Sequence, residues 1–229
     1  MKFLPKYFIL LLMAAFTTLT ARSQTGEQLH NLSLGFNGGI NMSSVSFAPK
    51  VSQKNLIGPG AGLSVRYIHE RWFGMLCGVQ MELNYAQRGW NEFYEDYPEL
   101  VYRRKLTYLE VPLMAHIGFG KKEGAIKFFI HAGPQFSYFL NDSRHEEGDW
   151  LSSRYHIHQH DQDVEHKFDY GVAGGAGIEL RTGIGHFQLE GRYYFGLSDI
   201  FGNTKADYFS RSANSVIGIK LTYLYDLMK

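Results

Sequence analysis

Apolar residues alternate with small or polar residues over long stretches of this sequence. In the longest stretch, "FGMLCGVQMELNY" at 73–85, every odd-numbered position from Phe73 to Tyr85 is apolar. The even-numbered positions include Gly78, Gln80 and Glu82. Successive side chains of a β-strand point to opposite faces of its sheet. The stretch therefore predicts a strand with one apolar face and one face of small or polar residues.

We predict eight such strands between Leu32 and Tyr225, and the mature part of the chain contains no segment with a helical period. Long polar connections at 42–57, 87–105, 141–167 and 199–213 alternate with short links near 69–72, 118–125 and 182–185. Hairpin-connected strands of this kind form antiparallel sheets. The sequence therefore predicts one all-β domain.

The expected strand length, roughly 9–13 residues, separates two all-β architectures. Strands of soluble sandwiches average about 5–6 residues, whereas a tilted strand needs about 9–11 residues to cross a bilayer. Long loops at one end and tight turns at the other are typical of outer-membrane barrels. Small residues on the polar face also suit the crowded inside of an eight-stranded barrel. We predict an eight-stranded antiparallel up-and-down transmembrane β-barrel, and a secreted soluble β-sandwich that binds a ligand is the alternative.

The first 23 residues have the features of a secretory signal peptide. Lys2 and Lys6 precede the apolar run 8–16, and small residues at 21 and 23 flank a cleavage site before Gln24. This predicts a signal peptide over 1–23 and a barrel domain over 24–229. The single cysteine, Cys77, excludes an intrachain disulfide.

Charge and motifs restrict the partners and cofactors. The chain has 23 lysine and arginine residues against 22 aspartate and glutamate residues, which gives no basic surface for nucleic acid. Its glycine clusters lack the G-x-G-x-x-G pattern of dinucleotide sites, and we expect no cofactor. The expected partner is the outer-membrane lipid around the apolar face, while the oligomeric state stays open.

Charged residues on the polar faces of the strands are expected to point into the lumen. An isolated buried charge is costly, so we expect these groups to form a nearly neutral salt-bridge network with a structural role. Pro112 cannot donate to the sheet and predicts a bulge or a local break in its strand. The expected network consists of Arg66, Glu82, Glu110, Asp169, Glu179, Arg181, Glu190, Arg192 and Lys220.

The connection at 141–167 contains three alternating histidines. In an extended backbone His156, His158 and His160 would point the same way, and imidazole is a ligand for zinc and copper. These residues are weak candidates for a metal site, because a solvated polar loop would have the same composition. We therefore expect no bound metal.

Several motifs together resemble the PorT-like family of small outer-membrane β-barrels. They are "YLEVP" at 108–112, "HAGPQFSY" at 131–138, "DYGVAGGAGIEL" at 169–180, "YYFGLSDI" at 193–200 and "NSVIGIKLTYLY" at 214–225. The resemblance implies an eight-stranded barrel in the outer membrane of a Gram-negative bacterium. It supplies no catalytic residues, and Tyr108, Glu110 and Pro112 match as motif positions only.

The founding member of this family is associated with protein secretion. The resemblance therefore implies a non-enzymatic envelope scaffold or accessory factor with a link to secretion, whose loops contact other envelope or secretion proteins. The alternative within the membrane is a barrel enzyme that acts on lipid or peptide at the extracellular rim.

Overall fold

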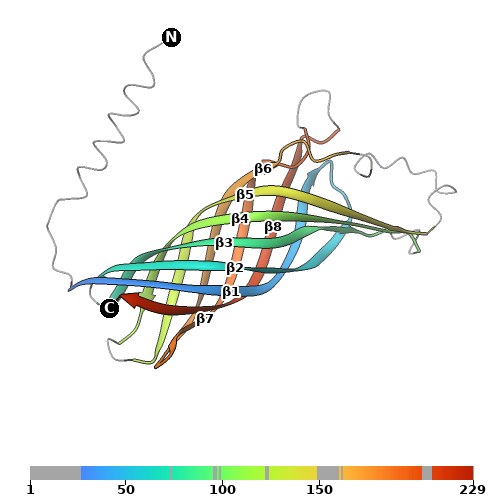
Figure 1. The fold of residues 1–229 in the computed structure, drawn as a ribbon. Helices are drawn as coiled ribbons and strands as arrows, with labels where there is room; N and C mark the ends of the chain where they lie inside the picture. The colour runs from blue at the N-terminus through green and yellow to red at the C-terminus, as the bar shows by residue number, and fades with distance from the viewer. Residues whose placement is uncertain are drawn as a thin grey trace, which may run out of the picture.

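The alternating segments form eight strands in the computed structural model, which describes residues 27–72, 74–94, 97, 99–121, 124–148, 160, 162–202 and 208–228. Each strand pairs antiparallel with the next, and the first pairs with the last, so the sheet closes into a barrel (Figure 1). This confirms the predicted barrel and excludes the β-sandwich. The strands are β1 (Glu27–Ala48), β2 (Gln53–Trp72), β3 (Met75–Glu92), β4 (Val101–Phe119), β5 (Ile126–Glu147), β6 (Phe168–Thr182), β7 (Gly185–Asp199) and β8 (Arg211–Met228).

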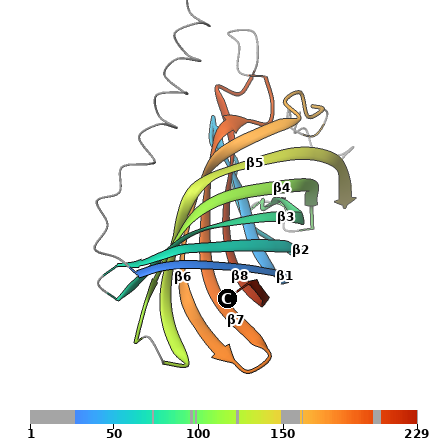
Figure 2. The ribbon, with the colours of Figure 1, turned by 60° about the vertical axis from the view of Figure 1, so that its left-hand side comes forward.

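The two ends of the barrel differ. The links β2–β3, β4–β5 and β6–β7 lie at one end together with the C-terminus, and we call this end the turn side (Figures 1 and 2). The other four links lie at the opposite end, which we call the loop side. In outer-membrane barrels the short turns face the periplasm and the longer loops face the outside. Within the described residues, no helix is long and apolar enough to cross a membrane.

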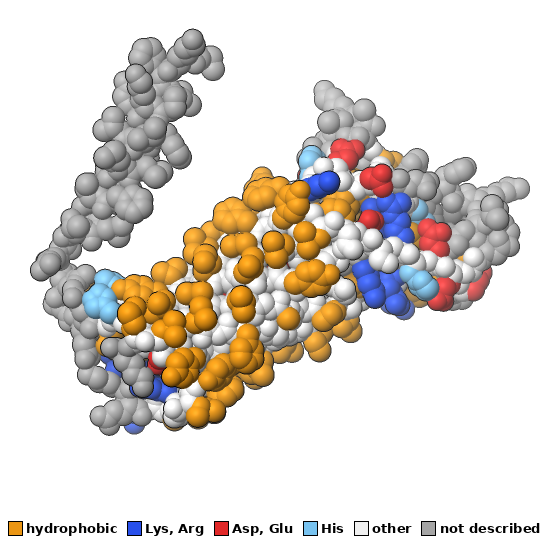
Figure 3. All heavy atoms as spheres, in the orientation of Figure 1, with side chains coloured by type: hydrophobic (Ala, Val, Ile, Leu, Met, Phe, Trp, Pro, Cys, Tyr) orange, Lys and Arg blue, Asp and Glu red, His pale blue; other side chains and the backbone are white. Residues whose placement is uncertain are grey.

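The apolar face of each strand points outward over the middle of the barrel. Phe36, Leu63 and Ile219 are 61%, 59% and 60% exposed, and together with similar side chains they form an apolar belt (Figure 3). The charged side chains visible in that view gather toward the two ends. A belt of this kind suits the hydrocarbon core of a bilayer.

The strands extend further on the loop side than the alternation predicts. They are up to 22 residues long, and most of the expected loop 87–105 is strand, because β3 continues to Glu92 and β4 begins at Val101. Polarity reverses in this extension. Trp90 and Leu106 point inward and are fully buried, whereas Arg103 and Lys105 are only partly buried on the outward face. Above the belt the barrel is therefore built like a soluble one, with apolar residues inside.

The inward side chains of this extension form a packed cluster that we call the loop-side core. The link between β7 and β8 takes part in it, since Ile200, Phe201 and Phe209 come from that link. The rings of Phe47 and Phe201 stack with centroids 6.2 Å apart. The core consists of Val45, Phe47, Trp90, Tyr102, Leu106, Tyr108, Ile200, Phe201 and Phe209. It fills the loop-side mouth of the barrel.

We expect Ile219→Arg to lower the free energy of unfolding by about 2–4 kcal/mol, the usual cost of arginine on the lipid face near the bilayer midplane. Ile219 is suited to this test because it is 60% exposed on the belt and lies opposite Gly191, midway along β7. Urea titration in lipid vesicles measures the change. Tyr225→Arg, on the same face of β8 near the turn side, is the control and should cost only about 0–1 kcal/mol. Equal costs at both depths would contradict the position of the belt.

Candidate functional site

Below the loop-side core, the inward face of the described barrel carries buried charged residues at three levels. Strands β3, β6, β7 and β8 supply most of them. Small residues on neighbouring strands make room for the long side chains. At Gly175, for example, a Cβ atom would lie 2.4 Å from Glu190 Oε1. We describe the three levels as the central, loop-side and turn-side charge clusters.

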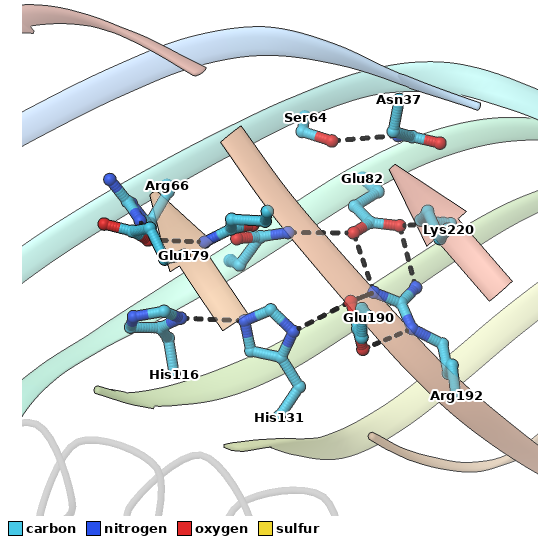
Figure 4. Close-up of polar contacts among 12 residues, drawn as sticks. Asn37, Ser64, Arg66, Glu82, His116, His131, Glu179, Glu190, Arg192 and Lys220 are labelled. Atoms are coloured by element: carbon cyan, nitrogen blue, oxygen red, sulfur yellow. Dashed lines mark hydrogen bonds and ion pairs between the residues drawn. The ribbon is translucent and has the colours of Figure 1, made fainter. Parts of the chain in front are cut away.

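The central charge cluster consists of Glu82, Glu190, Arg192 and Lys220 (Figure 4). Arg192 donates to both carboxylate oxygens of Glu82, at 2.8 and 2.9 Å, and to Glu190 at 2.7 and 2.9 Å. Lys220 Nζ lies 2.6 Å from Glu82 Oε2. Two acids and two bases balance one another, which is the condition under which buried charges are tolerated.

Two buried histidines extend the central cluster toward the turn side. His116 and His131 lie opposite each other on β4 and β5, and His116 Nδ1 is 2.8 Å from His131 Nε2. His131 Nδ1 lies 3.2 Å from Glu190 Oε2 (Figure 4). The two histidines are only 2% and 0% exposed. They are therefore enclosed in the lumen rather than presented at the extracellular rim, where a barrel hydrolase would need them.

The loop-side charge cluster explains the buried Glu110. Arg88 Nε donates to Glu110 Oε1 at 2.7 Å, and Arg88 Nη1 donates to Asp169 Oδ2 at 2.9 Å. The guanidinium of Arg88 also lies 5.0 Å from the ring of Tyr108 and 4.5 Å from that of Tyr194. Arg88 was absent from the predicted network because its segment was expected to be a loop. The motif residues Tyr108 and Glu110 thus surround one buried arginine.

Pro112, the third motif position, is buried in β4 and lies opposite Gln135 of β5. The pairing of β3 with β4 keeps one register on both sides of it, as Met81 opposite Leu113 and Asn84 opposite Glu110 show. Pro112 therefore interrupts the pairing locally and causes no bulge. The register shift in this part of β4 occurs instead between Thr107 and Tyr108.

The turn-side charge cluster is built around Glu179, which forms an ion pair with Arg66. His186 bridges two carboxylates, with Nδ1 2.8 Å from Glu179 Oε1 and Nε2 3.0 Å from Asp226 Oδ2. The prediction was wrong for Arg181, which is exposed at the end of β6. Its position, one residue before the strand ends, places it where the lumen opens to water. The expected single network is therefore three clusters, and Arg181 lies outside all of them.

The histidine-rich connection is only partly described. His156 and His158 lie outside the described residues, and His160 stacks on Tyr102 with ring centroids 3.4 Å apart. His160 Nε2 is also 3.0 Å from Glu92 Oε2. In the part of the chain that the structure describes, no three potential ligands are grouped closely enough for a metal ion.

The clusters leave little space in the middle of the barrel. A pocket among Arg88, Glu110, Arg192 and Lys220 has a volume of about 40 Å³. One water molecule occupies roughly 30 Å³ in the liquid, so this space is too small for a solute. With the loop-side core above it, the middle and the loop side of the described lumen are packed.

The fold is similar to that of a solved outer-membrane barrel, and two further solved structures align over most of their length. The outer membrane protein OprG from Pseudomonas aeruginosa has a TM-score of 0.52 and 12% identity, with 89% of this chain and 99% of OprG covered. Ail from Yersinia pestis, solved with a heparin analogue, has a TM-score of 0.40 and 15% identity over 87% and 100% of the two chains. Neisserial surface protein A has a TM-score of 0.42 and 11% identity over 84% and 96%. A search of curated protein sequences found no match.

The sequence itself matches a family of such proteins. The match to the outer membrane protein beta-barrel domain spans residues 21–202, most of the chain. The predicted location in the outer membrane of a Gram-negative bacterium is confirmed by this match, and lipid surrounds the apolar belt. A closed eight-stranded sheet, an outward apolar belt and a sequence match over this length lead to one conclusion: the chain belongs to the outer membrane protein beta-barrel domain family.

Proposed function

We propose that this barrel is a non-enzymatic scaffold in the outer membrane, and that its loop side contacts other envelope proteins. The observation that carries the proposal is the packed lumen. Arg192, Glu82 and Glu190 occupy the centre, and the loop-side core fills the mouth. Because the packed middle and loop side of the lumen leave little space for a solute to pass, we assign the scaffold role to the loop-side surface outside the lipid.

The loop-side extension supplies such a surface. β4 and β5 continue beyond the apolar belt to Val101 and Glu147, and their pairing persists to these residues. The outward side chains include Arg103 and Lys105, whereas Leu106 packs inward. A rigid sheet with its own core can hold a contact surface away from the membrane. We extend the proposal to protein secretion, because the motifs at 108–112 and 131–138 resemble the PorT-like family.

The enzyme alternative has less support in the described residues. The hydroxyl of Ser137 accepts a hydrogen bond from Arg88, with Nη2 3.3 Å from the serine Oγ. His116 and His131 instead contact each other. The serine is therefore not paired with a histidine base, which nucleophilic catalysis would require.

Affinity isolation from gently solubilised outer membranes tests the scaffold proposal. We expect the native barrel to co-purify with secretion components, identified by mass spectrometry, and a variant lacking residues 145–165 to lose most of them. Lys121→Glu, a charge change in the exposed link at the turn side, is the control and should retain them. Each variant must first show heat-modifiable migration in detergent gels as evidence of a folded barrel. The same partners with the deletion variant, or none with the native protein, would contradict the proposal.

A further inference from the structure

The turn-side end of the lumen contains a pocket of about 200 Å³. Three of the side chains around it are cationic, namely Arg66, Lys127 and Arg181, and three are apolar, namely Leu29, Ile68 and Leu76. Leu29 lies near the start of β1 and Arg181 is exposed near the end of β6, so the pocket lies where the barrel opens on the turn side. It is separated from the loop side by the central and loop-side charge clusters.

The carboxylates of this pocket already have partners. Glu179 accepts from Arg66, from His186 and from Gln188, whose Nε2 lies 2.8 Å from Glu179 Oε2. Asp226 accepts from Ser33 Oγ at 2.7 Å and lies 3.0 Å from His186 Nε2. The two carboxylates are therefore already paired with Arg66 Nη1 and with both ring nitrogens of His186.

Two cations of the pocket lack such a partner. Lys127, the second residue of β5, is only 7% exposed, and no carboxylate of the described residues lies within ion-pair distance of its ammonium group. The same holds for the guanidinium of Arg181 among the residues that the structure describes. Of the two, only Lys127 is buried, and a buried charge without a counterion is costly, so an anion in the pocket would offset that cost. The cationic wall is therefore suited to an acidic group from outside the chain.

The apolar wall indicates what that group is attached to. Ile68 is 4% exposed and lines the pocket beside Leu76, so a ligand would contact carbon on one side and positive charge on the other. The volume corresponds to roughly seven water molecules, enough for about six to eight non-hydrogen atoms. We propose that this turn-side pocket, with Lys127 and Arg181 as its anion-binding residues, binds a small organic anion that has one acidic head and a short apolar body. This site is independent of the scaffold role on the loop side.

Binding of butyrate to the folded barrel in a non-ionic detergent tests the site, and butylammonium is the matched ligand with the opposite charge. We expect butyrate to cause saturable NMR shifts of the Ile68 and Leu76 methyl groups, with a dissociation constant on the order of millimolar for so small a ligand. Butylammonium should cause no saturable shift. Both ligands carry the same chain, so the comparison removes the effect of partition into detergent.

Variants of Lys127 decide whether the charge is responsible. Lys127→Gln should weaken butyrate binding about tenfold, the effect of losing one charge-assisted contact. Lys127→Arg should keep most of the affinity, and Lys121→Gln, in the exposed adjacent link, should behave like the native protein. Equal shifts with both ligands, no saturable shift with butyrate, or native affinity in folded Lys127→Gln would each overturn the proposal.

Discussion

Replacing Arg192 with methionine is expected to lower the free energy of unfolding by about 3–5 kcal/mol, the cost of breaking a buried ion pair by removing one partner. Arg192 is the link between two carboxylates, because it donates to both oxygens of Glu82 and to Glu190. Its removal leaves Lys220 as the only cation within ion-pair distance of Glu82 among the described residues. Among the same residues, His131 would be the only ion-pair partner left to Glu190. Urea titration of the barrel in lipid vesicles measures the loss.

The matched control is Arg103→Met, which removes an arginine from the outward, partly exposed face of β4. Substitutions at such surface positions usually change stability by less than about 0.5 kcal/mol. A second variant, Glu82→Gln, removes one charge but keeps the shape of the side chain, and we expect it to destabilise the barrel less than Arg192→Met does. A cost for Arg192→Met no larger than that of the control would mean that the central cluster is hydrated rather than packed.

The alternation in the sequence predicted the membrane-crossing half of the fold well. Around Glu82 the lipid determines the pattern, since every outward residue between Val79 and Tyr85 must be apolar. The positions that point inward follow from the alternation of side chains along each strand, and Glu82 and Glu190 are indeed buried. Their partners could not be predicted in the same way. Glu82 and Arg192 are 110 residues apart in the sequence, and only closure of the barrel brings β3 and β7 to face each other across the lumen.

The loop-side half was mispredicted because its polarity is reversed. Ile40 and Met42 face outward in β1, whereas Val45 and Phe47 face inward a few residues later. The apolar residues thus move from the outward to the inward positions of the same strand. A prediction that expects apolar residues on the outward face only ends the strand at this point. It is in fact the point where the barrel leaves the lipid. For the same reason Arg88 was placed in a loop. Glu82, Ala86 and Arg88 are in fact all inward positions of one continuous strand.

The second large effect on stability is expected at Trp90, in the loop-side core. Trp90 is fully buried and packs edge-on against Phe47 and Phe201, with ring centroids 5.3 and 6.2 Å away. Its indole nitrogen donates to Glu92 Oε1 at 2.9 Å, and the guanidinium of Arg104 lies 5.7 Å from its ring. One side chain thus joins β1, β3, β4 and the β7–β8 link.

We expect Trp90→Ala to lower the free energy of unfolding by about 3–5 kcal/mol, because the substitution leaves a cavity that the surrounding sheet cannot close. Trp90→Phe keeps most of the ring contacts but loses the hydrogen bond to Glu92, and it should cost about 1–3 kcal/mol. Urea titration monitored by heat-modifiable migration gives both values on one scale. Since the loop-side core lies above the apolar belt, lipid cannot compensate for the missing ring. A loss below about 1 kcal/mol in Trp90→Ala would show that the loop side is not a packed core, and the scaffold role would then lose its rigid support.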